Sequence, residues 1–273
     1  MSGGHDPRRG DAAARVARRV AELILSYQPP SFARVPTADA ALFLTAIDHR
    51  TGFRGGHIVD GSGPHEGSDL LWALGLRAER RRPGTLTARG LADVGEGEVA
   101  KLFRIGGDEL AGPGERARHW RDLASGLERR YGGEASALIA AAEGLLGGPG
   151  GLLGRLSEFE AYSDPLQKKS FLVCKIWERR GWLRVGDPER WQVCADNVLM
   201  RLALRAGLVR GTDPEAVRAA TRSAWKQVAN LAGVSPPLLD DLLWERGRED
   251  PDLVGAEAGD LREPPRPSGT LFY

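Results

Sequence analysis

Helical periodicity runs through most of this chain and constrains its fold more than any other feature. Residues 12–27 place valine, leucine and isoleucine on one face and arginines on the other, as in an amphipathic helix, and two prolines end the pattern. The same analysis predicts further helices over residues 38–48, 97–104, 114–131, 135–146, 166–180, 195–209, 214–232 and 237–247. No segment shows the period of two that a half-buried strand requires, and no repeat occurs. The sequence therefore predicts an all-α fold, a helical bundle.

Length and apolar content allow one sizeable core. The chain has 273 residues, of which 41% are hydrophobic, and this is enough for a single domain or for two closely packed lobes. The Gly-rich stretch at residues 147–151 is the clearest hinge signal, and a Pro-rich tail runs over residues 250–273. We expect one domain over residues 1–273, with a lobe boundary near residues 147–151.

The charge balance argues against a large polyanion as the main partner. The 38 Lys and Arg residues are offset by 37 Asp and Glu residues, so the chain has no global basic field of the kind that duplex DNA or a membrane surface selects. No apolar stretch is long enough to span a bilayer, and no signal peptide is evident. These features predict a cytoplasmic protein with a small-molecule substrate and no membrane partner.

Cys174 and Cys194 are the only cysteines in the sequence. They are too few and too far apart for a zinc knuckle, an iron–sulfur cluster or a disulfide scaffold. We expect both to be core residues in a reducing compartment, and we expect no cofactor.

Two adjacent lysines precede a run that is apolar almost all the way round. Lys168 and Lys169 stand directly before Phe171, Leu172 and Val173 in the predicted helix 166–180. Burying an ammonium group there is costly unless the charge has a partner or a task. We expect Lys168 to point into a polar cleft and Lys169 to be an ordinary charge facing solvent.

Two predicted helices in the C-terminal third carry further candidate site residues. Asp196 begins an amphipathic helix, where it is either an N-cap or a catalytic carboxylate that stabilises positive charge developing on a sugar. Asp240 and Trp244 are four residues apart and share one helix face. This pair is either a helix-surface contact or part of a substrate-binding site.

A Gly-rich loop concentrates side chains of the kinds that bind metals: Asp48, His49, His57, Asp60, His65, Glu66 and Asp69. Their spacing matches no helical His-x-x-x-His motif, and Gly-rich loops collect polar residues in any case. We therefore expect no metal and a substrate-facing loop in which Asp48 or His49 reads a base edge. Phe53, Trp72 and Trp244 are candidate stacking groups, with ordinary core packing as the alternative for each.

The C-terminal third resembles the archaeal 8-oxoguanine DNA glycosylase/lyase family, of the helix-hairpin-helix class of N-glycosylases. The resemblance rests on the order Gln167-Lys168, an acid after a short loop, a tryptophan-containing helix, Pro-Pro-Leu, and Asp240-x-x-x-Trp244. It implies that Lys168 attacks the sugar, that the acid assists, and that the helix carrying Asp240 and Trp244 helps to hold a flipped base.

Over its full length the chain is more similar to the queuosine salvage family of queuosine 5′-phosphate N-glycosylases. The matching segments, in that family's order, are ARRVAELIL (17–25), ALFLTAIDHRTGF (41–53), EVAKLFR (98–104), LERRYGG (127–133), Ala195-Asp196, LLDDLLW (238–244) and Leu271-Phe272-Tyr273. The resemblance implies an all-α fold of the helix-hairpin-helix glycosylase type, Asp196 as the catalytic acid, and free queuine as the product.

The sequence departs from both families at identifiable positions. Residues 48–53, DHRTGF, replace an aromatic-rich stretch that packs on the deazaguanine base in the salvage family, and only Phe53 keeps the aromatic character. Residues 197–200, NVLM, replace a Tyr-Arg-x-Pro-like sequence. The Leu-Pro-Gly-x-Gly hairpin of glycosylases that bind duplex DNA is missing. These differences bear on the substrate more than on the reaction class.

The sequence predicts an N-glycosidase that releases a guanine-like or deazaguanine base from a nucleoside 5′-monophosphate. Asp196 is expected to stabilise the oxocarbenium ion or to deprotonate the attacking water. Lys168 is expected either to hold the 5′-phosphate or to form a Schiff base. The alternatives are an 8-oxoguanine DNA glycosylase/lyase, with nucleic acid as partner, and a nucleotide-binding homologue without activity. The oligomeric state is not predicted.

Overall fold

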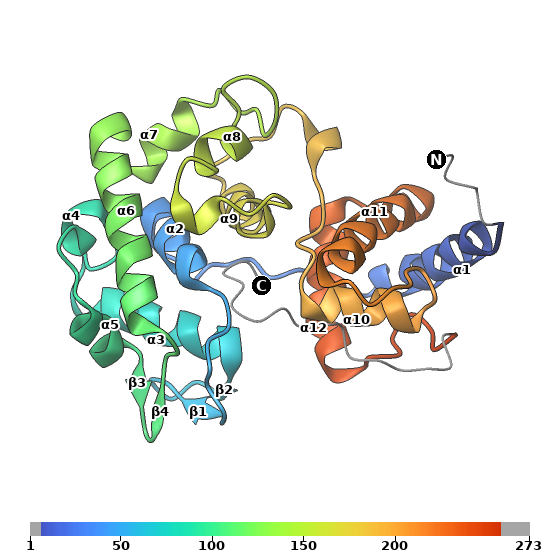
Figure 1. The fold of residues 1–273 in the computed structure, drawn as a ribbon, viewed down its shortest axis with the longest axis horizontal. Helices are drawn as coiled ribbons and strands as arrows, with labels where there is room; N and C mark the ends of the chain where they lie inside the picture. The colour runs from blue at the N-terminus through green and yellow to red at the C-terminus, as the bar shows by residue number, and fades with distance from the viewer. Residues whose placement is uncertain (1–6, 258–273) are drawn as a thin grey trace. The chain divides into compact units, whose positions relative to one another are not determined.

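The computed structural model describes residues 7–257, and these residues form an all-α fold (Figure 1). The α-helices are α1 (Pro7–Ile24), α2 (Ala38–Ile47), α3 (Gly67–Arg81), α4 (Ala88–Leu91), α5 (Glu96–Leu102), α6 (Pro113–Tyr131), α7 (Ala135–Ala140), α8 (Leu152–Leu156), α9 (Lys168–Arg179), α10 (Asn197–Arg205), α11 (Pro214–Ala232) and α12 (Pro236–Glu249). Two 3₁₀ turns, Glu160–Tyr162 and Pro188–Arg190, complete the helical structure. The predicted all-α class is confirmed. Most of the predicted Pro-rich tail, with the terminal Leu271-Phe272-Tyr273, lies outside the described residues.

None of the helices in the described range combines the length and the apolar character that crossing a bilayer requires.

The described residues fall into two compact units. One unit contains residues 7–30 and 191–257, and the other contains residues 31–190. The Gly-rich stretch 147–151, where the sequence predicted a lobe boundary, lies inside the larger unit. It forms a tied loop there, because the backbone N–H groups of Leu146 and Gly147 donate to the carboxylate of Asp187 over 2.8 and 3.0 Å.

Helix α2 is the central element of the larger unit. Its sequence is apolar all round, so every residue from Ala40 to Ile47 is buried, and it packs against α3, α6, α7 and α9. Figure 1 shows it between α6 and α9. Three aromatic side chains from these surroundings donate to its backbone carbonyls, those of Trp120, Tyr162 and Trp177. These hydrogen bonds hold the first and middle turns of α2 in place.

Close packing of α3 on α2 depends on one glycine. A Cβ atom at Gly75 would come within 2.3 Å of the buried Leu44 side chain, so any larger residue would force Leu44 to move. The approach brings the first turns of α3, with Ser68 and Trp72, to the C-terminal end of α2.

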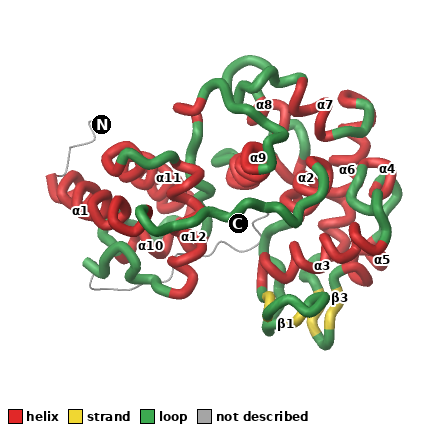
Figure 2. The backbone as a smooth tube through the Cα atoms, turned by 180° about the vertical axis from the view of Figure 1, so that it is seen from behind, coloured by secondary structure: helices red, strands yellow, loops and turns green. Residues whose placement is uncertain are grey.

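Two short antiparallel hairpins are the β-structure of the described chain (Figure 2). Strand β1 (His57–Ile58) pairs with β2 (Pro64–His65), and β3 (Arg104–Ile105) pairs with β4 (Asp108–Glu109). The sequence predicted no strands, because ladders of two residues are too short to show an alternating pattern.

The smaller unit is built from α1, α10, α11 and α12. Helix α1 packs on α11 and α12, and α10 packs on the same two helices. The fully buried Trp225 of α11 donates to the backbone carbonyl of Leu199 in α10 over 3.0 Å. Helix α12 begins with a proline at its first position, where the missing N–H costs nothing.

Candidate functional site

Helix α9 starts at the lysine pair because of a local turn around Asp164. One carboxylate oxygen of Asp164 accepts from the backbone N–H of Leu166, and the other accepts from the N–H of Lys168, both over 2.9 Å. Gln167 takes a left-handed conformation, with φ of 54°. This turn fixes the positions from which the two lysine side chains leave the helix.

Lys169 is completely buried, so the prediction that it faces solvent is wrong. Its Nζ donates to the backbone carbonyl of Ala46 over 2.7 Å and lies 3.0 Å from Nδ1 of His49. The cause is tertiary: this position of α9 faces α2, whose last turn supplies the carbonyl acceptor.

Lys168 is 9% exposed, and among the described residues its Nζ makes no hydrogen bond or ion pair. Its positive charge acts on the neighbouring lysine. Burial, and then the charge of Lys168, lower the pKa of Lys169 from 10.5 to about 7. The pair therefore combines one cation that lacks an anionic partner with one amine that is partly neutral near pH 7.

His49 lies between Lys169 and Glu115. Its Nε2 is 2.7 Å from Oε1 of Glu115, and its side chain is fully buried. Burial, and then the positive charges of Lys169 and Arg116, hold the pKa of His49 far below its usual value, so the imidazole is neutral. A neutral imidazole has one N–H, and a carboxylate only accepts. We therefore assign the proton to Nε2, which donates to Glu115, while Nδ1 accepts from Lys169.

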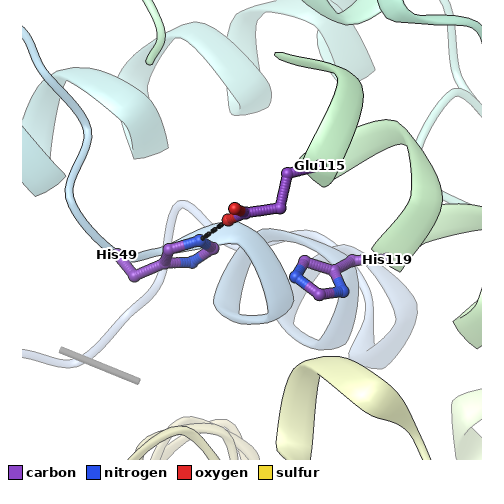
Figure 3. Close-up of side chains that lie close together, drawn as sticks. All are labelled: His49, Glu115 and His119. Atoms are coloured by element: carbon purple, nitrogen blue, oxygen red, sulfur yellow. Dashed lines mark hydrogen bonds and ion pairs between the residues drawn. The ribbon is translucent and has the colours of Figure 1, made fainter. Parts of the chain in front are cut away.

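His119 completes this cluster (Figure 3). Its ring meets that of His49 edge to face, with centroids 6.0 Å apart, and its side chain is 0% exposed. Within residues 7–257 neither ring nitrogen makes a hydrogen bond, although Oε2 of Glu160 lies 3.5 Å from Nδ1. Burial, and then the charge of Lys169, lower the pKa of His119. One ligand-type atom each of His49, Glu115 and His119 lies within 4.8 Å of the others.

The sequence analysis missed Glu115 and His119. Both lie in the predicted helix 114–131, whose amphipathic pattern was interpreted as ordinary packing with no sign of a site. Their separation of four residues places them on one helix face, and this was the available signal. Their proximity to His49, which is 66 residues away from Glu115, depends on tertiary packing.

Asp48 is buried at the end of α2 and orients an aromatic ring. Its Oδ2 accepts from Oγ of Ser68 over 2.8 Å and from Nε1 of Trp72 over 3.1 Å. Its Oδ1 accepts no hydrogen bond among the described residues. Phe53 is partly exposed and takes no part in this hydrogen-bonded group. The structure thus brings together Asp48, His49, Trp72 and the lysine pair, all in the larger unit.

A pocket of about 300 Å³ adjoins the Trp72 side chain. Its lining residues are Arg34, Val59, Ser62, His65, Asp69, Trp72, Ala73, Leu76 and Arg80. The volume is at the lower end of the range for small-molecule sites. An aromatic wall with two arginines suits a flat, anionic ligand.

The histidines of the Gly-rich loop do not converge on one site. His57 bonds to Asp108 over 2.9 Å, and His65 bonds to Ser62 over 2.7 Å. Among the described residues of this loop, only His49 belongs to a group of three potential ligands, and the other two come from α6.

In the smaller unit, Asp196 is the N-cap of α10. Its Oδ1 accepts from the backbone N–H groups of Val198 and Leu199 over 2.9 and 3.0 Å. The capping role that the sequence allowed is confirmed, and a catalytic role stays a prediction.

Asp240 and Trp244 lie on α12 of the same unit. Asp240 is buried and accepts from the backbone N–H of Cys194 over 2.6 Å, so it fixes the segment that leads into Asp196. Trp244 is partly exposed, with the guanidinium of Arg248 4.5 Å from its ring centroid. Their proposed contacts with a base stay predictions. Both cysteines are buried free thiols, as predicted.

The depressed pKa of Lys169 predicts a stability that depends on pH. Between pH 7 and 10.5 the unfolded chain binds a proton that the folded chain lacks, so this lysine makes the free energy of unfolding rise with pH across that window. The slope from one proton is at most about 1.4 kcal/mol per pH unit. Lys169→Met should remove this contribution. Denaturant unfolding of EDTA-treated protein at pH 7, 8 and 9 measures it.

The matched control for this experiment is Lys101→Met, at an exposed lysine of α5. It should keep the pH slope of the wild type. Equal slopes in the wild type and Lys169→Met would show that Lys169 titrates normally in the folded protein.

Comparison with known proteins identifies the fold. No family model matches the chain, and no curated protein matches it. Among solved structures, it is similar to Pa-AGOG, an 8-oxoguanine DNA glycosylase from Pyrobaculum aerophilum, in its complex with 8-oxoguanosine. The TM-score is 0.55, the sequences are 18% identical, and the match covers 88% of each chain. A likeness at this identity shows the fold alone: the chain has an all-α fold of the helix-hairpin-helix DNA glycosylase type.

Proposed function

We propose that this protein hydrolyses N-glycosidic bonds and releases a guanine-like or 7-deazaguanine base from a nucleoside 5′-monophosphate, as in queuosine salvage. The proposal rests on the ammonium group of Lys168, which is buried and has no anionic partner among the described residues. A cation that is nine-tenths buried and lacks an anionic partner is costly to keep. A bound phosphate supplies the missing partner through charge-assisted hydrogen bonds.

The surroundings of Trp72 support a flat base as the second part of the ligand. Asp48 holds the indole N–H, and the ring forms one wall of the adjoining pocket. Stacking on an aromatic side chain contributes about 1–3 kcal/mol per base. The free Oδ1 of Asp48 is an acceptor for the N–H groups of a guanine-type edge.

For bond cleavage we propose Asp196 as the carboxylate. Loss of the base leaves oxocarbenium character on the sugar, which an oriented carboxylate stabilises. The same group can take the proton of the attacking water. Phe53, Asp240 and Trp244 are proposed as further substrate contacts, and His49 as the residue that holds Lys169.

A second candidate function is 8-oxoguanine DNA glycosylase/lyase activity. It is favoured by the fold of the similar glycosylase and by the lysine pair, since a neighbouring cation is one of the settings that activate a lysine as a Schiff-base nucleophile. The third possibility is a nucleotide-binding protein that keeps the fold without activity.

One experiment separates these functions. The protein is incubated with guanosine, 7-deazaguanosine, queuosine and adenosine 5′-monophosphates, with the same nucleosides lacking phosphate, and with oligonucleotides containing 8-oxoguanine. Chromatography and mass spectrometry detect the released base. We expect release from guanine-type 5′-monophosphates and much slower release without the phosphate. Release from the oligonucleotides with strand cleavage supports the repair activity, and binding without release supports the inactive homologue.

The proposed role of Asp48 predicts a change in base selectivity. In Asp48→Asn the side-chain carbonyl can still accept from Ser68 and Trp72, while an amide NH₂ replaces the free Oδ1. Discrimination between a guanine-type and an adenine-type nucleotide should fall by roughly tenfold, the value of one hydrogen bond to a charged group. The ratio of kcat/KM values on the two nucleotides measures it. Equal losses on both would assign Asp48 to holding Trp72 alone.

A further inference from the structure

We propose that His49, Glu115 and His119 bind a divalent transition-metal ion of the zinc class. The three side chains offer two imidazole nitrogens and one carboxylate oxygen within 4.8 Å of one another. Two histidines and a glutamate form a donor set that zinc uses in catalytic sites. The proposal is independent of the N-glycosidase activity proposed above.

The backbone places the three ligands before any ion arrives. Glu115 and His119 are four residues apart on α6, so one helix face presents both. His49 follows the last turn of α2, which packs directly on α6. Figure 3 shows the His119 ring turning one edge toward His49 and Glu115.

The ring nitrogens of His119 give independent evidence that an ion binds here. Its side chain is fully buried, and no described residue makes a hydrogen bond to either ring nitrogen. Buried polar atoms in native proteins are nearly always partnered, and an ion is one of the groups that explains an exception. The other buried histidine of the cluster, His49, is bonded at both nitrogens.

Glu160 provides the outer contact that metal-binding histidines usually have. Its Oε2 lies 3.5 Å from Nδ1 of His119, which leaves Nε2 for the ion. A carboxylate in this position fixes the tautomer and raises the basicity of the ligating nitrogen.

Coordination requires small side-chain shifts and a change of tautomer at His49. To bind the ion through Nε2, His49 must carry its proton on Nδ1, and Lys169 must accept from that N–H as a neutral amine, which releases one proton to solvent. Ligand atoms about 2.0–2.1 Å from a tetrahedral ion lie roughly 3.3 Å apart. His49 Nε2 and Glu115 Oε1, at 2.7 Å, are already closer than this, and the side chain of Glu115 is 25% exposed and able to move. Three protein ligands leave a fourth position for water.

Positively charged side chains next to the cluster should lower its affinity for a metal ion. Lys169 contacts the other nitrogen of His49, and Arg50 approaches Glu115 at 3.3 Å, while Glu160 and Asp48 offset part of this charge. The cations compete with the ion, so we expect a reversible site and a fold that is stable without metal.

The test uses tag-free, EDTA-treated protein. Zinc binding is followed by calorimetry and cobalt binding by its visible absorption, which reports coordination directly. The wild type should take up about one equivalent of each ion. Glu115→Gln, which keeps volume at a partly exposed position, and His119→Gln should each weaken binding by at least about tenfold.

The matched control is His65→Gln, because His65 bonds to Ser62 in the same unit and lies outside the cluster. It should bind zinc and cobalt as the wild type does. The proposal is overturned if the wild type takes up no stoichiometric ion, or if His65→Gln weakens binding as much as Glu115→Gln. Circular dichroism checks folding, and Glu115→Gln decides the outcome if the buried His119→Gln fails to fold.

Discussion

Asp196→Asn is expected to lower turnover of a guanine-type nucleoside 5′-monophosphate by at least about a hundredfold while leaving α10 intact. Asparagine caps helices as well as aspartate does, so its side-chain oxygen can accept from Val198 and Leu199 as the carboxylate does now. Only the charge is lost. Removing one electrostatic contact to a transition state costs about 10²–10³ in kcat. Rates of base release and denaturant unfolding measure the two effects.

Asp213→Asn is the matched control. Asp213 caps α11 in the same unit, with Oδ1 accepting from the backbone N–H of Ala216 over 2.7 Å. This variant should match the wild type in both measurements. Asp196→Ala should lose the cap as well, at about 1 kcal/mol of stability. Base release near the wild-type rate in Asp196→Asn would leave Asp196 as a cap and nothing more.

Most helices could be predicted because their ends carry explicit signals. Helix α11 runs from Pro214 to Ala232 as predicted, since an aspartate caps it, a proline starts it and a glycine ends it. Helix α3, from Gly67 to Arg81, was not predicted, because its apolar stretch covers only residues 70–76. It continues to Arg81 because glutamate and arginine are good helix formers, although the apolar pattern that marks a buried face has already stopped.

The site was only partly predictable, because its contacts cross long distances in sequence. Lys169 shares a helix face with Val173 and Ile176, which are both buried. This spacing indicated that Lys169 is buried. The indication was overlooked because Lys168, next to it, was interpreted as the lysine with a role. The acceptor at Ala46, however, is 123 residues away, and no local pattern identifies it. The same holds for His49 and His119, whose edge-to-face contact comes from the packing of α2 on α6.

Lys168→Ala is the second variant with a large expected effect. A hydrogen bond to a charged group contributes about 1.5–3 kcal/mol, so losing the ammonium should raise KM for a 5′-phosphorylated nucleoside roughly 10- to 100-fold. The change in kcat should be smaller, since the phosphate contact exists both before and during bond cleavage. Steady-state kinetics with and without the 5′-phosphate measure it, because the unphosphorylated nucleoside should show little difference between variant and wild type.

Lys168→Arg separates the two chemical roles of this side chain. A guanidinium keeps the positive charge and binds phosphate, so a phosphate-binding role predicts substantial recovery of KM. A Schiff base needs a neutral primary amine, which arginine cannot supply. In that case the arginine variant would be as inactive as Lys168→Ala, and borohydride would trap the wild type on an abasic oligonucleotide. We expect recovery by arginine and no trapped adduct, because a 5′-phosphate would supply the anionic partner that Lys168 lacks among the described residues.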